Sequence, residues 1–522
     1  MTTDSPAAPP SGGSERPGSS TAPPPGAGSA FAIERNGINV IDESERKGHP
    51  RDLFWPWCAA NISFLGMSYA AFVLYFGLSY WQALLASLVG TILSFLLVGF
   101  VSVAGKRGSA PTMVLSRAAF GVRGNALPTL VSYLILVGWE TILVALSTLA
   151  TATIFEQMGW GSGDLTKVIA FLATAALIVV AGVLGFETIM RLQKLITIAT
   201  VALTIGFILV TLDEIDWSAV SAMKGGTTQA VIGALVLMMT AFGLSWVNSA
   251  ADYSRYLPRT ASTPAVIGWT TFGGAVAPVI LLVYGLLLIG SRPELIDQIG
   301  ADPLGTLATL LPNGLSHDVG IAALLVYAVV VVAGLVAGAV LDLYSSGLSL
   351  LTLGLPTARW TAALLDGVLM IIGAIYIVWF ATDFIGPFQG FLITLGVPIA
   401  SWCGIFLADL MLRRRAYDEV DLFDPRGRYG SANATPILLM VISTAIGWGL
   451  VVNFSSGFGW EGYLLDLFGL GGKAGSWSGA NLGVAFAFAL SFVGYPLLCA
   501  GRVRAQERQE SRTVASSDPA RV

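Results

Sequence analysis

Two acidic residues stand in the middle of long apolar segments, where a carboxyl group is unusual. Glu140 lies in LVGWETILVA and Asp342 lies in GAVLDLYSSG. If these segments cross a bilayer, a charge at their centre costs about 2.5–3.5 kcal/mol, so such acids usually face a cavity and bind a substrate, an ion or a proton. The alternative for each is a structural hydrogen bond to a neighbouring helix. Both acids are therefore candidates for chemistry inside the segments.

Three aromatic residues could contact a flat ligand. Trp139 directly precedes Glu140 and lies far from the segment ends, where Trp is usually found. Its indole face would suit a planar ring by offset stacking, and the alternative is packing against neighbouring helices. Phe242 and Trp246 lie four residues apart in MMTAFGLSWVNSAADYSRYLPR, so a helix there would place both on one face.

Glycine and serine interrupt two of the apolar segments. One interruption is Gly66-Met67-Ser68 in NISFLGMSYA, and the other surrounds Gly243 and Ser245. Unwound backbone at membrane depth is tolerated where it lines a cavity, so these stretches could offer free backbone groups to a ligand. The alternative is an ordinary glycine-containing helix. The two interruptions are five segments apart, as an inverted repeat of five helices would give.

The composition places these residues in a polytopic membrane protein. Hydrophobic residues make up 55% of the 522 positions, 60 further positions are glycine, only 11% are charged, and the mean hydropathy is +0.74. Soluble domains carry about 25% charged residues, so a soluble globular chain and a disordered chain are both excluded. The net charge of −4 does not give the basic field that a nucleic-acid-binding protein needs.

The sequence contains no pattern typical of an enzyme or a cofactor site. Cys58, Cys403 and Cys499 have no spacing that suggests a disulfide framework or a thiolate metal site. The two histidines, His49 and His317, lie in polar segments. Metalloprotease, nucleophile-elbow and phosphate-loop motifs are also absent from the sequence. We therefore expect no enzymatic activity and no cofactor.

Twelve apolar segments are long enough to cross about 30 Å of hydrocarbon, which takes about 20 residues in a helix. We predict an all-α integral membrane protein with a disordered tail over 1–30, a polar segment over 31–52, a twelve-helix domain over 53–500 and a second tail over 501–522. The predicted spans are 53–78, 81–104, 127–155, 166–185, 193–212, 229–250, 264–290, 320–345, 361–380, 385–411, 436–455 and 480–500.

The distribution of Lys and Arg predicts the orientation. With the N-terminus inside, 24 of the 28 basic residues fall on the inner side and 4 fall in outer loops. Losing or adding one helix would destroy this bias, so it also supports the number of spans. We predict a multi-pass protein of the cell membrane with both termini in the cytoplasm. Asp252, Asp366 and Asp409 then lie near cytoplasmic ends, where they would cap helices or pair with Arg255 and Arg413–Arg415; the alternative for each is a gating role.

Five stretches of sequence form a recognisable set: ERNGINVIDESER, LSRAAFGVRGNALPTL followed by GW at 138–139, ADYSRYLPR, LDLYSSGLSL and GFLITLGVPIASWCGIFLADLMLRRRAYD. Together they resemble the nucleobase–cation symporter-1 family, the purine–cytosine permeases and their hydantoin and allantoin relatives. The resemblance covers residues 33 to 500. It implies the leucine-transporter-type fold, with inverted repeats over 53–212 and 229–411 and two peripheral helices over 436–500.

The resemblance further implies a planar base at mid-membrane between spans 1, 3, 6 and 8. A span-three Trp stacks on the substrate in the family, and the GW motif makes that residue Trp139. A second aromatic comes from span six; the family position falls on Gly243, so Phe242 or Trp246 would take the role. The span-eight amide of the family falls on Asp342. A carboxylate there could accept hydrogen bonds from ring N–H or exocyclic amino groups.

The resemblance also bears on the coupled cation. Sodium-coupled relatives use span-one carbonyls and two span-eight hydroxyls, and the latter positions fall on Val336 and Ala337. Neither side chain can bind sodium. With an acid in the pocket, this favours a proton over sodium, carried by Asp342 or by Glu140.

We therefore predict a secondary active transporter that imports a nucleobase, cytosine or a purine, by proton symport and alternating access. The alternatives are the same fold carrying allantoin, a hydantoin or a thiamine-like vitamin ring, sodium coupling, and a transport-inactive nucleobase sensor. The expected partners are the small planar substrate and the lipid bilayer; the sequence does not predict an oligomeric state. The predicted substrate-binding residues are Trp139, Asp342, Phe242, Trp246, Gly66, Ser68 and Gly243.

Overall fold

The computed structural model describes residues 36–161, 163–183, 186–311, 317–381, 385–453 and 457–516. The regular secondary structure in these ranges is helical, as predicted. The predicted tail over 1–30 lies outside the described residues, as do the last residues of the second tail. The part of the second tail that is described continues the last helix as far as Ser516.

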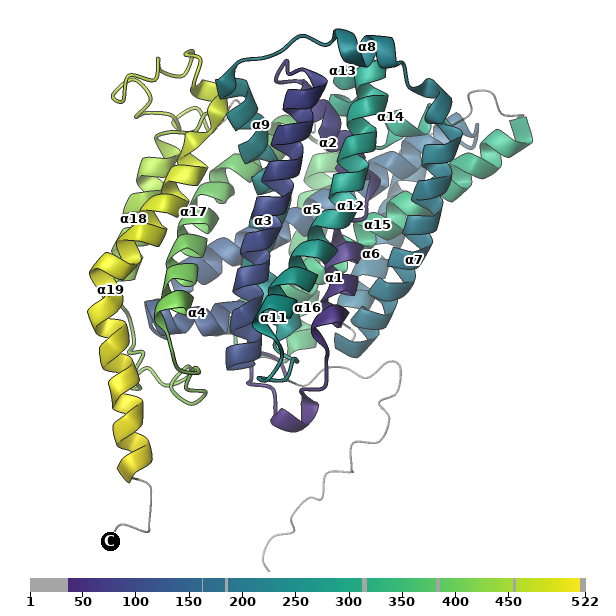
Figure 1. Ribbon diagram of the computed structural model, residues 1–522. Helices are drawn as coiled ribbons and strands as arrows, with labels where there is room; N and C mark the ends of the chain where they lie inside the picture. Colours follow the sequence, from purple (N-terminus) through teal and green to yellow (C-terminus); the bar gives the residue numbers. More distant parts are fainter. Residues whose placement is uncertain are drawn as a thin grey trace, which may run out of the picture.

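The predicted spans correspond one for one to helices or broken helices (Figure 1). Within the described ranges, ten helices are long and apolar enough to cross a membrane, a bent pair makes an eleventh span, and a shorter apolar helix of 15 residues makes the twelfth. In chain order the spans are α1 (Phe54–Asn61) with α2 (Phe64–Leu74), α3 (Tyr80–Gly108), α5 (Ala126–Gln157), α6 (Asp164–Val183), α7 (Phe186–Val210), α9 (Thr228–Ala241) with α10 (Gly243–Trp246) and α11 (Ala250–Ser254), α12 (Thr263–Ser291), α15 (His317–Thr352), α16 (Arg359–Trp379), α17 (Ile385–Leu412), α18 (Ala434–Trp448) and α19 (Leu482–Ser516).

Short helices lie between or within the spans. The α-helical ones are α4 (Thr112–Phe120), α8 (Trp217–Ala222), α13 (Leu295–Ala301) and α14 (Gly305–Ala308). The 3-10 helices are η1 (Glu43–Glu45), η2 (Pro50–Leu53), η3 (Leu212–Glu214), η4 (Val247–Ser249) and η5 (Ser478–Ala480).

The first span is broken at Ile62 and Ser63, four residues before the interruption that the glycine predicts. The helices on either side are bent by 62°. Ser63 has extended backbone angles, and its hydroxyl accepts a hydrogen bond from the Leu65 amide at 3.3 Å, so it acts as the N-cap of α2. Gly66 stays helical, and its missing side chain leaves room for Leu281 of α12.

The sixth span is broken at Phe242, within the predicted stretch. Phe242 has φ −114° and ψ −113°, which ends α9, and Gly243 begins α10. A Cβ on Gly243 would lie 2.3 Å from the carbonyl carbon of Ser94 on α3, so only glycine permits this approach. The Gly243 amide donates to the Ser94 hydroxyl at 3.1 Å. The two broken spans are therefore five spans apart, as the inverted repeat requires.

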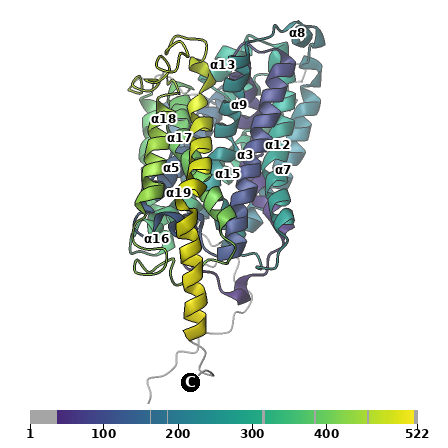
Figure 2. The ribbon, with the colours of Figure 1, turned by 60° about the vertical axis from the view of Figure 1, so that its left-hand side comes forward.

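The helices pack as a bundle around the two breaks. α15 packs along α5, and α12 packs along α3. α17, α18 and α19 pack together at one side, and α19 extends beyond the bundle as a single helix (Figure 2). The end of α19 and the segment with η1 and η2 emerge at the same end of the molecule (Figure 1). Large apolar side chains such as Leu165, Leu209 and Leu497 are exposed on the outside, as a lipid-facing surface requires.

Two of the three acids predicted near helix ends behave as expected. Asp409 forms a buried ion pair with Arg413, with 2.7 Å between Oδ2 and Nε, and accepts a hydrogen bond from the Tyr495 hydroxyl at 2.6 Å. Asp252 accepts hydrogen bonds from the backbone amide and the hydroxyl of Thr112, at 2.7 and 2.8 Å, and so caps α4.

Candidate functional site

A cavity of about 50 Å³ lies where the two broken spans meet α5 and α15. A cavity that holds benzene has a volume of about 150 Å³, so a nucleobase-sized ring would enter only when the surrounding groups move apart. The lining residues come from α1, α2, α5, α9, α10, α15 and the two break points. They are Ala60, Asn61, Ser63, Leu65, Gly66, Tyr69, Trp139, Leu143, Ala241, Phe242, Trp246, Gly334 and Asp342.

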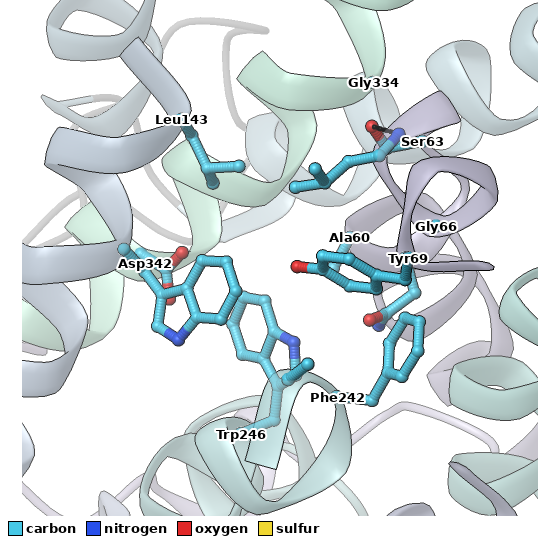
Figure 3. Close-up of a pocket in the computed structure, with 13 residues that line it drawn as sticks. Ala60, Ser63, Gly66, Tyr69, Leu143, Phe242, Trp246, Gly334 and Asp342 are labelled. Atoms are coloured by element: carbon cyan, nitrogen blue, oxygen red, sulfur yellow. Dashed lines mark hydrogen bonds between the residues drawn. The ribbon is translucent and has the colours of Figure 1, made fainter. Parts of the chain in front are cut away.

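Five of the predicted substrate-binding residues line this cavity: Trp139, Asp342, Phe242, Trp246 and Gly66. They come from four separate spans, and the fold alone brings them together. In Figure 3, Asp342 lies across the cavity from Gly66, with Phe242 and Trp246 at its lower edge.

The other two predicted contact residues lie beside the cavity. Ser68 turns away from it, and its hydroxyl donates to the Pro303 carbonyl at 2.5 Å. Gly243 packs against the backbone of α3 at Ser94. Gly243 permits the second break and Ser68 links α2 to Pro303, but neither residue lines the cavity.

Aromatic contacts fix the ring planes around the cavity. The Trp139 indole meets Phe388 of α17 edge to face, with 5.6 Å between centroids and 79° between planes. Trp246 meets Trp57 in the same way at 5.8 Å. Phe242 meets Tyr69 at 5.1 Å. Such pairs are favourable beyond the burial of their area, so the faces that a flat ring would contact are held in place.

Two residues that line the cavity carry polar atoms without hydrogen-bond partners. Asp342 is 1% exposed, and its Oδ2 atom has no hydrogen-bond partner among the described residues. The Trp139 Nε1 atom is likewise buried without a partner. A buried carboxylate oxygen and a buried N–H without partners are costly, and both belong to residues that line the cavity, so a ligand that reached them would be favoured.

The sequence reasoning missed Tyr69 and Asn61. The Tyr69 hydroxyl points into the cavity (Figure 3), and the Asn61 side chain donates to the Trp57 carbonyl at 2.8 Å next to the first break. Tyr69 lies three residues after Gly66, so once Gly66 is placed at the cavity, helical periodicity would have indicated Tyr69 as well.

Glu140 lies outside the cavity, beside another acid. Its Oε1 atom accepts a hydrogen bond from the Ser346 hydroxyl at 2.6 Å, and the same hydroxyl lies 3.1 Å from Oδ2 of Asp366. The expectation that Asp366 caps a helix or pairs with an arginine is wrong, because it is fully buried and its other oxygen accepts from the Tyr133 hydroxyl at 2.6 Å.

The span-eight positions predicted for a cation contain no side-chain oxygen. Val336 and Ala337 are buried, and the Ala337 carbonyl accepts a hydrogen bond from the side-chain Nε2 atom of Gln193 on α7 at 2.8 Å. Among the residues that the structure describes, no cluster of three or more His, Cys, Asp or Glu side chains could hold a metal ion.

A further buried acid lies beyond the end of α18. Glu461 is 1% exposed and accepts a hydrogen bond from the Thr394 hydroxyl of α17 at 2.9 Å. Burial raises the pKa of Glu461 to about 7, against the lowering effect of its hydrogen bonds. This carboxyl group therefore titrates near neutral pH.

Comparison with known proteins gives matches along most of the chain. The family model for permeases for cytosine/purines, uracil, thiamine and allantoin matches residues 40–503. A putative purine-cytosine permease of Bacillus subtilis, YxlA, is 23% identical over 419 residues, which cover 79% of this chain and 86% of that protein. The cytosine permease of Escherichia coli K12 is 27% identical over 386 residues, which cover 71% of this chain and 79% of that protein.

A solved structure shares the fold. Mhp1, a nucleobase-cation-symport-1 family transporter in a closed conformation with bromovinylhydantoin bound, superposes with a TM-score of 0.66 at 18% identity, covering 92% of this chain and 97% of that chain. The likeness confirms the predicted leucine-transporter-type arrangement of the helices.

Proposed function

Because the chain belongs to the family of permeases for cytosine/purines, uracil, thiamine and allantoin, we propose that this membrane transporter imports cytosine or a purine together with a proton. The observation that carries the proposal is the pairing of Trp139 with the unpartnered Asp342 carboxylate at the meeting point of two broken spans. One group suits the face of a planar base and the other suits its N–H edge.

Recognition would combine stacking with hydrogen bonds. The base would lie against Trp139, with Phe242 and Trp246 on the span-six side. Asp342 would accept from a ring N–H and an exocyclic amino group, which cytosine, adenine and guanine provide. The relatives named as cytosine or purine–cytosine permeases support this substrate class.

Transport would follow from the breaks in the two spans. The small cavity volume means that the groups around a bound base separate to admit it and close around it afterwards. Rocking of one group of helices against another around this fixed site would expose it to each side of the membrane in turn. The Lys and Arg distribution supports the cell membrane and a cytoplasmic location of both termini.

Proton coupling is supported by the apolar side chains at the two span-eight positions where sodium-coupled relatives carry hydroxyls. Val336 and Ala337 bring no hydroxyl to these positions, and the Ala337 carbonyl accepts a hydrogen bond from the Gln193 side chain. Two acids near the cavity, Asp342 and Glu140, can instead take up and release a proton.

A second candidate substrate is a cationic vitamin-like ring such as thiamine. It is favoured by one observation: no basic side chain of the described residues pairs with Asp342, so its charge could balance that of an amine-bearing ligand.

Uptake into proteoliposomes tests the proposal. Labelled cytosine, adenine, guanine, hypoxanthine, uracil, allantoin and thiamine are offered with an imposed proton gradient, a sodium gradient or neither. Concentrative uptake of cytosine or a purine driven only by protons is expected. Uptake driven only by sodium would overturn the coupling, uptake of thiamine alone would overturn the substrate class, and binding without accumulation would indicate a sensor.

A further inference from the structure

One serine hydroxyl lies between two buried carboxyl groups on three different helices. Ser346 of α15 is 2.6 Å from Glu140 of α5 and 3.1 Å from Asp366 of α16. The sum of these distances, 5.7 Å, is the largest separation that the two carboxyl oxygens can have. All three residues are fully buried.

Both contacts are full hydrogen bonds only if one of the two acids carries a proton. A serine hydroxyl has a single hydrogen and can donate it to one carboxylate only. If the hydroxyl donates to Glu140, its contact with Asp366 is a hydrogen bond only when Asp366 is protonated and donates to the serine oxygen. The mirror arrangement places the proton on Glu140.

The surrounding groups do not neutralise a second negative charge. The titratable groups nearest the pair are Asp342 on α15 and Tyr133 on α5, and no basic side chain forms an ion pair with either acid among the described residues. Arg359 lies two turns from Asp366 on α16, and its guanidinium donates to the carbonyls of Gly182 and Val183. α6 carries its charged residues, Asp164 and Lys167, at its first turn. Two like charges at this separation in a dry site cannot both persist, so one acid stays neutral.

We propose that Glu140, Ser346 and Asp366 form a proton-binding site that is separate from the substrate cavity and holds one shared proton. Transfer is balanced: the Asp366 proton moves to the Ser346 oxygen while the Ser346 hydrogen moves to Glu140, and the reverse transfer restores the first state. Tyr133 contacts Asp366 and lies seven residues, about 10 Å along α5, from Glu140 toward the predicted cytoplasmic end, so it extends the route in that direction.

The site is placed to respond to the substrate. Ser346 follows Asp342 by four residues on α15, so the two lie on one face, about 6 Å apart along the axis. On α5, Glu140 directly follows Trp139 of the cavity. A ligand that moves α5 against α15 would therefore change the Glu140–Ser346 contact. This inference rests on the proposed proton symport.

The test separates substrate exchange from proton-driven accumulation. Asp366→Asn, Glu140→Gln and Ser346→Ala are placed in proteoliposomes beside Ser147→Ala, which removes a buried hydroxyl of α5 that pairs with Thr174 instead. Exchange of internal for external labelled cytosine needs no net proton movement. We expect all four variants to exchange, but the first three to lose accumulation under a proton gradient and to lose the accompanying internal acidification. Ser346→Thr, which keeps a hydroxyl, should regain both.

The outcomes distinguish the two levels of the proposal. If the unaltered protein shows no proton-driven accumulation, the proposed function fails and this site fails with it. If the unaltered protein accumulates substrate and Asp366→Asn and Ser346→Ala accumulate it equally, only the shared-proton site is refuted. Ser346→Ala keeps both acids, so it tests the shared-proton site even if an acid variant does not fold. In addition, the infrared C=O stretch of protonated carboxylic acids, to which Glu461 also contributes, should lose intensity in the acid variants and keep it in Ser147→Ala; unchanged intensity in both acid variants contradicts a shared proton.

Discussion

Replacing Asp342 by Asn tests the substrate chemistry most directly. The amide has nearly the same shape as the carboxylate and keeps an oxygen acceptor, but it carries no charge. Asp342 is 1% exposed and its Oδ2 atom has no partner among the described residues, so this substitution breaks no existing hydrogen bond of the side chain. Any loss of cytosine binding would then come from the ligand contact rather than from the fold.

The expected magnitude follows from the difference between charged and neutral hydrogen bonds. A hydrogen bond to a charged group contributes about 1.5–3 kcal/mol and a neutral one about 0.5–1.5 kcal/mol. Losing the charge at Asp342 should therefore cost about 1–2 kcal/mol of binding free energy, which raises the Kd roughly 5- to 30-fold. Asp342→Ala removes the acceptor altogether and should raise the Kd by roughly 10- to 150-fold.

Binding of labelled cytosine to the purified protein measures this effect, with the change in intrinsic tryptophan fluorescence as a second readout. Asp318→Asn is the matched control, because Asp318 is exposed at the other end of α15, 24 residues or about 36 Å along the helix. An Asp342→Asn protein that binds cytosine and accumulates it as the unaltered protein does would refute the assignment of Asp342 to the substrate.

Three further predictions concern stacking, pH and folding. Trp139→Ala should weaken cytosine binding by about 1–3 kcal/mol, the worth of base–aromatic stacking, with a smaller loss for Trp139→Phe; equal Kd values would exclude stacking on this residue. Glu461 has a folded-state pKa of about 7, raised from 4.5, so its contribution to stability is complete at low pH and is lost as the pH rises through 7. The Tm should therefore fall between pH 5 and pH 8, and Glu461→Gln should reduce that fall. Asp409→Ala leaves Arg413 buried without its ionic partner and should lower the free energy of unfolding by about 3–5 kcal/mol in a thermal unfolding assay. Glu187→Ala, which removes one side of the exposed Glu187–Arg191 pair, should lower it by about 0–1 kcal/mol.

The spans could be predicted from the sequence because hydropathy and helix length depend on local composition, whereas the cavity residues were predicted from acids, aromatics and glycines at membrane depth and from the family resemblance. All twelve predicted segments correspond to helices, and five predicted contact residues line one cavity. The exact place of the first break could not be predicted from glycine alone. There, Ser63 caps a new helix and Gly66 continues it, because an N-cap hydrogen bond ends a helix more decisively than a glycine within it.

The rotation of each helix about its axis is what the sequence left undetermined. Asp366 lies near a predicted helix end, which suggests a cap or a surface ion pair. Its actual neighbours come from two other spans. Tyr133 lies 233 residues away in the sequence and Ser346 lies 20 residues away. Only the packing of α5, α15 and α16 brings these side chains together. Tyr69 was missed for the same reason, since its direction depends on the 62° bend before α2.

On α5, the residue proposed to stack on the substrate and the residue proposed to bind a proton face different neighbours. Neighbouring residues of a helix point about 100° apart, so Trp139 faces the cavity while Glu140 faces Ser346 and Asp366. The two places are joined only through shared helices. If binding at one changes the affinity at the other, thermodynamic linkage requires the effect to be reciprocal. A base that tightens proton binding at the Glu140–Asp366 pair must itself bind more tightly as the pH falls, by the same factor. The part of the pH dependence of cytosine binding that comes from this pair should therefore disappear in Asp366→Asn even though every residue of the cavity is unchanged, and any part that remains belongs to other groups such as Asp342.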